Sequence, residues 1–230
     1  MTLKKLTDLG NGPSRRRYAD ACGTAHALDL IGERWALLVL RELMLGPKRF
    51  SDLRADLPGI SANTLTQRLE GLEAHGLLVR RRLPPPAAAQ VYELTQWGYE
   101  AEPIVQVMGR WATRSPAHDP TMPLSATSLM LSFRTMGDPE RMQGLKARIG
   151  FRIGAETFVV EIADGRMSAE RGAIESADLV FTGPAPAIAG AVYGGVPIEA
   201  LETEGAFKVE GDRDLAAKFV TLFPLPPKAG

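Results

Sequence analysis

The chain has 230 residues, of which 45% are hydrophobic and 23% charged, and its formal net charge is zero. This composition is typical of globular domains and excludes a disordered or collagen-like chain, and no apolar run is long enough to predict a membrane span. One cysteine excludes an internal disulfide framework, and the N-terminal segment lacks an apolar stretch of signal-peptide length, so we expect a cytoplasmic protein.

The two halves of the chain differ in charge. Residues 1–118 hold 16 Lys and Arg against 12 Asp and Glu, a net of +4, and residues 119–230 hold 11 against 15, a net of −4. A basic half followed by an acidic half indicates two domains, of which the first is the better partner for a polyanion. The proline-containing segment RSPAHDPTMPLSA (114–126) marks the boundary, and we expect the linker over 116–125.

Helical spacing predominates in the first half. The segment AHALDLIGERWALLVLRELMLG (25–46) carries a helix-spaced apolar stripe, which Gly32 divides into two predicted helices. The segment RFSDLRADLPG (49–59) predicts a short helix, with Ser51 as a candidate N-cap and Pro58 at its end.

The segment PGISANTLTQRLEGLEAHGLLVRRRL (58–83) predicts a capped helix followed by a strand. Ser61 is a typical N-cap and Gly76 a typical glycine after a helix end, and an inward leucine stripe lies between them. The three prolines after the strand suit a hairpin tip, and VYELT (91–95) predicts the returning strand. A final helix is expected over 96–114, with Thr95 as its candidate N-cap. This order of helices and hairpin is that of a winged helix-turn-helix, in which the capped helix enters the major groove.

The polar face of the capped helix and the arginine strand are the candidate DNA-contacting surface. Amides pair with adenine edges, arginine pairs with guanine, and hydroxyls pair with a base or a phosphate. The alternative is a solvated polar face on a core helix beside a solvated strand, and the full order of elements favours DNA. The predicted DNA-contacting residues are Ser61, Asn63, Thr64, Gln67, Arg68, Arg80, Arg81, Arg82 and Gln90.

The motifs IGERW, LRELMLGPKRFSDLR, LPGIS, LTQRL and YELT make the segment Tyr18–Ser115 similar to the HxlR-type transcriptional regulators. The resemblance implies a domain over 18–115 that binds a near-palindromic operator as a homodimer, with Ser61–His75 as the recognition helix. Family members often have a basic residue where this chain has Asn63, which changes the expected operator and not the binding mode.

The resemblance also implies a dimer interface built from two flanking helices, Cys22–Ile31 and Gln96–Arg114. In the second of these helices, Trp97 and Trp111 are candidate interface anchors.

Cys22 has two interpretations. A thiol near a helix N-terminus and downstream of Arg15–Arg17 can have a lowered pKa, and some HxlR-type relatives use a cysteine here as a redox sensor. The alternative is a buried, inert thiol, and Cys-Gly replaces the family's frequent Cys-Pro. Cys22 and His26 alone make a poor metal site, so we expect no metal or cofactor. Residues 1–17 are expected to form a flexible basic arm that either contacts phosphates or is simply disordered.

The second half predicts an α+β domain, so the fold class of the chain is α+β. Strand-like alternation in ARIGFRIGAETFVVEIADGRMSAERG (147–172) is interrupted by turns at 154–156 and 164–165, and ADLVFTG (177–183) predicts another strand. The segments 185–195, 197–205 and 212–223 have helical spacing. No nucleophile elbow, phosphate-binding loop, dinucleotide fingerprint or metal-ligand motif is found, so an enzyme is not expected.

The pattern ADG, RG, ADLVFTG, GG, FKVEGD resembles the sterol-carrier-protein type of lipid-binding domain across about Ser128 to Pro224, and we expect this domain over 126–226. The resemblance implies a five-stranded sheet with helices over one face that encloses an apolar tunnel for a lipid-like or aromatic ligand. The alternative for each apolar residue is ordinary core packing. The candidate lining residues are Leu129, Phe133, Phe158, Val160, Val192, Tyr193, Phe207, Phe219 and Phe223.

Together these patterns predict a homodimeric regulator that binds specific double-stranded DNA and responds to an apolar small molecule in its second domain. A protein of another class, a lipid or apolar-ligand carrier whose winged helix serves protein contact, is the alternative. The two classes differ in affinity for duplex DNA, which should fall steeply with salt for the regulator and be absent for the carrier.

Overall fold

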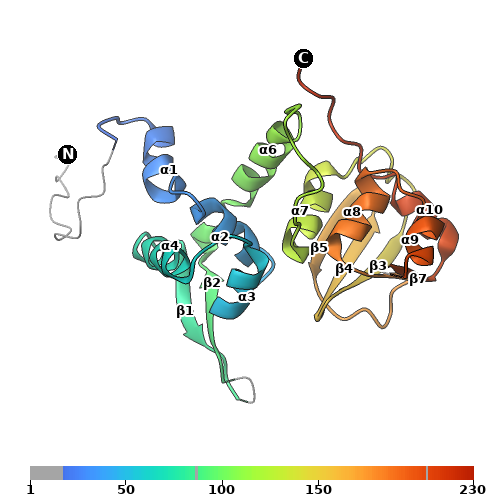
Figure 1. Cartoon of the computed structure of the whole chain (residues 1–230), viewed down its shortest axis with the longest axis horizontal. Coiled ribbons are helices and arrows are strands. Elements are labelled where there is room, and N and C mark those ends of the chain that lie inside the picture. The colour runs from blue at the N-terminus through green and yellow to red at the C-terminus, as the bar shows by residue number, and fades with distance from the viewer. Residues whose placement is uncertain (1–17, 86–87, 206) are drawn as a thin grey trace.

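The structure is a computed structural model that describes residues 18–85, 88–205 and 207–230. Figure 1 shows two parts side by side, a group of short helices with a long hairpin and a sheet covered by helices. The first part consists of α1 (Gly23–Ile31), α2 (Ala36–Leu43), α3 (Phe50–Asp56), α4 (Ala62–Ala74), β1 (Leu78–Arg82), β2 (Gln90–Leu94), α5 (Gln96–Tyr99) and α6 (Glu102–Ala112). This order confirms the winged helix-turn-helix.

The predicted caps of the capped helix α4 and of the helix after the hairpin are confirmed. The Ser61 hydroxyl accepts the N–H of Thr64 at 3.1 Å, and Gly76 takes a left-handed φ of 74° just beyond the helix end. The Thr95 hydroxyl accepts the N–H of Gly98 at 3.1 Å and donates to the Gly76 carbonyl at 2.8 Å. The end of α4 and the start of α5 are therefore held together.

Two expected helix boundaries in this part are wrong. The N-cap of α3 is Arg49 rather than Ser51, because the Arg49 N–H donates to the Asp52 carboxylate at 3.3 Å and Ser51 lies within the helix. The helix expected over 96–114 is divided into α5 and α6. Pro103 lies in the first turn of α6, where its missing N–H has no intrahelical partner to lose, whereas one continuous helix would place it in the interior.

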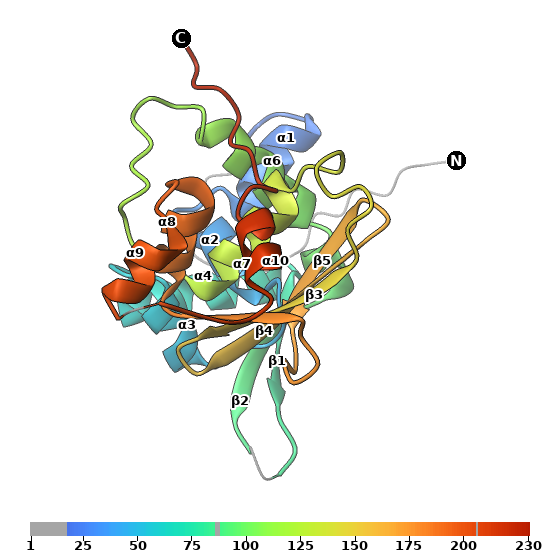
Figure 2. The same cartoon turned by 90° about the vertical axis from the view of Figure 1, so that its right-hand side faces the viewer.

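The second part is a mixed sheet with helices on one face (Figure 2). Its strands form one sheet in the order β5-β4-β3-β6-β7, antiparallel except for the parallel β3–β6 pair, which confirms the expected five-stranded sheet. Residue spacing predicts neither α7 nor β7. The elements are α7 (Ala126–Met136), β3 (Ala147–Ile153), β4 (Glu156–Ala163), β5 (Arg166–Arg171), β6 (Leu179–Thr182), α8 (Ala185–Tyr193), α9 (Ile198–Thr203), β7 (Lys208–Gly211) and α10 (Arg213–Phe219).

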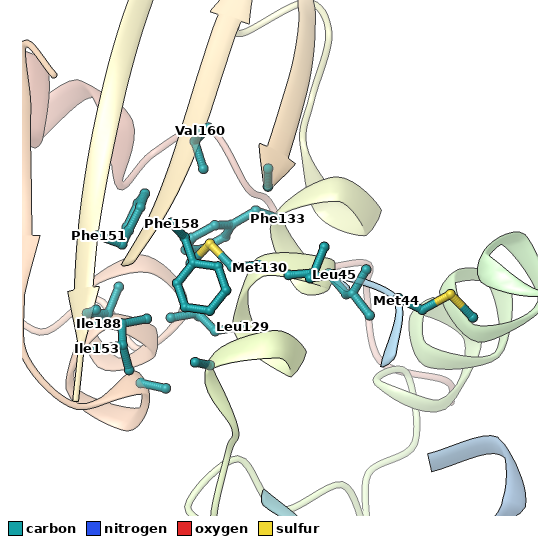
Figure 3. Packing of buried hydrophobic residues seen from close by; sticks show 14 of the residues in the cluster. Met44, Leu45, Leu129, Met130, Phe133, Phe151, Ile153, Phe158, Val160 and Ile188 are labelled. Atoms are coloured by element: carbon teal, nitrogen blue, oxygen red, sulfur yellow. The ribbon is translucent and has the colours of Figure 1, made fainter. Parts of the chain in front are cut away.

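Helix α7 connects the two parts. It packs against α2 and α6 on one side and against β5 and α8 on the other. Its residues from Ala126 to Leu131 are all buried. Met44 and Leu45, which follow α2, belong to the same continuous apolar core as Leu129 and Met130 of α7, and part of this core is drawn in Figure 3. The two parts therefore share buried surface instead of being joined by a chain segment alone.

The C-terminal tail returns to the first part. The tail contacts the segment between α6 and α7, which contains turns and bends without a helix or strand. The Lys228 ammonium donates to the carbonyls of Thr113 and Ser115 at 3.0 and 3.2 Å, and the Ala229 N–H donates to the Arg114 carbonyl at 2.7 Å. A cation at the carbonyls just beyond Ala112, where α6 ends, matches the negative end of that helix. None of the helices in the described ranges has the length and apolar character needed to cross a membrane.

Candidate nucleic-acid interface

The outer face of α4 presents free polar side chains. Leu65, Leu69 and Leu72 are almost completely buried on its inner face. Asn63 and Gln67 are exposed on the other side, and neither side chain is hydrogen-bonded to another residue in the described ranges. Both amides therefore keep a donor and an acceptor available for a base edge.

The side chains of Ser61 and Thr64 form hydrogen bonds at the N-terminus of α4. In addition to the capping bond, the two hydroxyl oxygens lie 2.8 Å apart in a hydrogen bond. The free N–H groups of the first turn, and the one hydroxyl proton not used between Ser61 and Thr64, are the donors that this end of α4 can offer to a phosphate.

Arg68 is largely occupied within the molecule. Its Nε donates to the Arg34 carbonyl at 2.9 Å and its Nη2 lies 3.1 Å from the Glu33 carboxylate, and the side chain is only 15% exposed. Both partners lie in the turn between α1 and α2, where Trp35 has a left-handed φ of 78°. Nearer the end of α4, His75 Nδ1 lies 3.3 Å from the Leu30 carbonyl oxygen. Arg68 therefore fastens α4 to the preceding turn, a role that spacing does not reveal.

The three arginines of the wing differ in their partners. Arg80 is bound to Glu73 of α4 through Nε at 2.9 Å and Nη2 at 2.6 Å, and this hydrogen-bonded carboxylate raises the pKa of Arg80. Arg81 pairs with Glu93 on the neighbouring strand. Arg82 is exposed and has no ion-pair partner among the residues described. Arg80 thus joins the wing to the recognition helix, and Arg82 is the most available cation of the three.

The wing arginines surround a hollow. This hollow has a volume of about 470 Å³ and is lined by Arg80, Arg81, Arg82, Ala88 and Gln90. Gln90 pairs with Arg82 across the hairpin and is also exposed. Figure 1 shows the hairpin extending from beside α4, so the predicted DNA-contacting residues fall on two adjacent elements.

The flanking helices leave apolar side chains uncovered. On α6 the exposed fractions reach 73% for Trp111 and 69% for Val107, and Trp97 at the start of α5 is 48% exposed. On α1, Leu28 is 46% exposed. These residues lie on the two helices for which a dimer interface was expected.

Cys22 lies at the N-cap position of α1 and is exposed, so it is not the buried thiol of the alternative interpretation. The backbone N–H and hydroxyl of Thr24, with the N–H of Ala25, lower the pKa of this thiol. Arg15–Arg17 and the rest of the expected basic arm lie outside the described residues. Over those described residues, no group of three or more His, Cys, Asp or Glu side chains is arranged to hold a metal ion.

The candidate ligand-lining residues are mostly packed against one another. The ring centroid of Phe133 lies 4.7 Å from that of Phe223 and 5.5 Å from that of Phe219, and Phe181 lies 5.7 Å from Phe207. Leu129, Phe158, Val160 and Val192 are buried as well, as expected of either a core or a closed pocket. The contacts among the rings are those of a core.

Tyr193 is the polar member of this group. Its hydroxyl lies 2.8 Å from the Ser132 hydroxyl of α7, and burial raises the pKa of the phenol far above its usual value. Thr127, also on α7, is completely buried and its hydroxyl has no hydrogen-bond partner among the described residues.

Comparison with known proteins assigns a family model to each part. Residues 30–119 match HxlR-like helix-turn-helix, and residues 130–224 match the SCP-2 sterol transfer family. An uncharacterized HTH-type transcriptional regulator of Synechocystis sp., sll1512, is 41% identical over 87 residues, which are 38% of this chain and 64% of that protein.

A second relative is the HTH-type transcriptional regulator YodB of Bacillus subtilis. It is 37% identical over 86 residues, which are 37% of this chain and 77% of YodB. The structure described as the reduced form of YodB is 34% identical, covers 43% of this chain and 98% of that one, and superposes with a TM-score of 0.38. Both relatives are described as HTH-type transcriptional regulators.

Proposed function

Since the chain belongs to the HxlR-like family of helix-turn-helix transcriptional regulators, we propose that it is a cytoplasmic homodimer that binds a specific operator in double-stranded DNA. The observation that carries the proposal is the pairing of a capped helix with a free polar face and a hairpin with three arginines, on adjacent elements. Helix insertion into the major groove with the wing along the backbone is the use of this arrangement in DNA-binding proteins.

The proposed contacts follow from which side chains are free. Asn63 and Gln67 would contact base edges, and Ser61, Thr64 and the first-turn N–H groups would contact phosphate. Arg68 belongs to the predicted set, and a base contact would require its guanidinium to leave Glu33. Amide side chains would therefore provide most of the base recognition.

The wing is proposed to contact the DNA backbone. Arg82 and Gln90 are exposed and free, whereas Arg80 and Arg81 would approach phosphates while paired with Glu73 and Glu93. Backbone contacts of this kind add affinity without base preference.

We propose that α1 and α6 form the dimer interface. The uncovered apolar side chains Leu28, Val107 and Trp111 support this assignment, since large aromatic and aliphatic groups are the usual anchors of protein interfaces. Dimerisation would place two recognition helices for two half-sites of one operator.

The C-terminal domain, proposed to extend over 126–226 after a linker at 116–125, is the proposed site of an apolar ligand. Its match to a sterol transfer family supports a ligand of lipid-like character. Because Phe133, Phe219 and Phe223 contact one another, a ligand would have to separate these rings to enter. A second input is proposed at Cys22, whose exposure and lowered pKa support a reactive thiolate.

Salt dependence of duplex binding tests the proposal against a carrier. Titration of the full chain into a labelled duplex should show affinity that falls steeply as salt rises, with a log–log slope of about −0.9 for each phosphate contact. A protein that binds apolar ligands but shows no duplex affinity even at low salt would be the carrier instead.

A further inference from the structure

A buried polar cluster lies where the winged helix meets the C-terminal domain. The Glu42 side chain of α2 is completely buried, and its carboxylate accepts hydrogen bonds from Lys48 at 3.1 Å, Arg41 at 2.7 Å and Ser125 at 2.8 Å. Lys48 is 1% exposed and also pairs with Asp56 of α3. Two cations and two carboxylates balance one another, and the buried charges of Glu42 and Lys48 depend on these partners to offset the loss of water.

On one side the cluster ends at the first turn of α7. Ser125 is the N-cap of α7: its hydroxyl oxygen accepts the N–H of Ser128 at 3.0 Å and lies 2.8 Å from both the Glu42 carboxylate and the Ser128 hydroxyl. The Ser128 hydroxyl lies 3.4 Å from the same carboxylate. The Glu42 carboxylate therefore lies at the positive end of the helix dipole. Since α7 packs on β5 and α8, a shift of this helix relative to the C-terminal sheet would change the distance between Ser125 and Glu42.

On the other side the cluster ends at the wing. The Lys48 N–H donates to the Tyr92 carbonyl at 3.1 Å, and the Tyr92 N–H donates to the Lys48 carbonyl at 2.8 Å. Lys48 thus forms an isolated antiparallel bridge to β2, whose neighbour in the two-stranded sheet is the arginine strand β1. One residue therefore joins the wing through its backbone and α7 through its side chain and Glu42.

The other end of α7 is fastened to the proposed dimer helix. Arg134 donates to both carboxylate oxygens of Glu102 in α6 at 2.8 Å and also to the Ala169 carbonyl of β5. Helix α7 is therefore bound by charged groups at both ends, to the wing side and to the dimer side.

We propose that Glu42, Lys48 and Ser125 form a positioning centre that sets the placement of the wing according to the position of α7. Apolar contacts tolerate sliding, but a buried charge that moves away from its partners is left unpaired, so the cluster allows few relative positions. The inference rests on the proposed DNA binding and adds the route by which the C-terminal domain would regulate it.

Variants of Ser125 separate this role from helix capping. Ser125→Asn keeps a capping acceptor and can donate to Glu42, whereas Ser125→Asp keeps the cap but loses the donor and brings a second carboxylate beside Glu42. The probe is a mixed-sequence duplex of about 30 base pairs, long enough for two half-sites one turn apart. Asp212→Asn, which alters the cap of α10 away from the cluster, is the matched control.

We expect Ser125→Asp to bind this duplex at least about tenfold more weakly than Ser125→Asn, with a salt slope reduced by about one because a wing contact to phosphate is lost. In an Arg81→Ala/Arg82→Ala background the difference between the two Ser125 variants should disappear. Asp212→Asn should bind like the wild type.

The possible contrary results have two distinct meanings. Equal binding by folded Ser125→Asp and Ser125→Asn proteins would overturn the positioning centre, and so would a difference that persists without the wing arginines. If Ser125→Asp does not fold, Ser125→Ala is compared with Asp212→Ala, and equal effects of these two cap deletions would also overturn it. A wild type that does not bind duplex DNA at any salt would instead refute the proposed function.

Discussion

The two parts of the molecule differ in whether the side chains of their candidate sites are exposed or packed against one another. On α4 the polar groups proposed to contact DNA, Asn63 and Gln67, are exposed and have no hydrogen-bond partner in the described part of the chain. In the C-terminal domain the aromatic rings of Phe133, Phe219 and Phe223 are satisfied by one another, at centroid distances of 4.7–5.5 Å. The first surface is ready for a partner as it stands, and the second must rearrange to receive one.

The largest effect is expected from Phe133→Ala. If the rings form a core, the cavity left behind should lower the free energy of unfolding by about 3–5 kcal/mol, measured by urea denaturation. Leu225→Ala, at a half-exposed position in the same part of the chain, is the control and should have little effect. A loss below about 1 kcal/mol would contradict the packing of these rings as a core, since it would indicate that Phe133 borders an open pocket.

An intermediate effect is expected from Gln67→Ala. Loss of a base contact should weaken binding to the cognate operator by about 1–3 kcal/mol and relax the preference at one base pair, without a change in unfolding free energy. Selection of bound sequences from a random pool gives both the operator and this preference. Glu70→Ala, an exposed change further along α4, is the control.

Arg68→Ala, in contrast to Gln67→Ala, should lower the free energy of unfolding, because the Arg68 guanidinium holds the turn between α1 and α2.

A smaller, uniform effect is expected from Arg82→Ala. Because phosphate contacts carry no base information, the variant should bind all duplexes more weakly and show a salt slope reduced by about one. Binding isotherms at several salt concentrations provide the slope. Unchanged affinity and slope would show that the wing does not reach the backbone through this residue.

The smallest effect concerns Cys22. The Thr24 and Ala25 groups that lower the thiol pKa stabilise the thiolate, so alkylation by iodoacetamide should become fast at a lower pH than in a short unfolded peptide. Thr24→Ala should move the rate profile back toward higher pH. A wild-type profile that coincides with that of the peptide would contradict the lowered pKa.

Local chemistry explains what could be predicted from the sequence. Ser61, Gly76 and Thr95 act on backbone groups within a few residues, so their capping roles follow from residue type and spacing. The same local reasoning was wrong for α3, whose N-cap is Arg49 and not Ser51, because the Arg49 N–H donates to the Asp52 carboxylate. The α+β class and the winged helix-turn-helix follow from such local patterns taken in order.

Only the tertiary structure decided which polar side chains are free. Sequence spacing places Gln67 and Arg68 equally on the predicted DNA face, but Arg68 is occupied by Glu33, which is distant along the chain. The cluster of Glu42, Lys48 and Ser125 is likewise assembled from α2, the segment after it and the start of α7. A sequence specifies the charge and length of a side chain, whereas its partner depends on which distant segments the folded core brings within hydrogen-bonding distance.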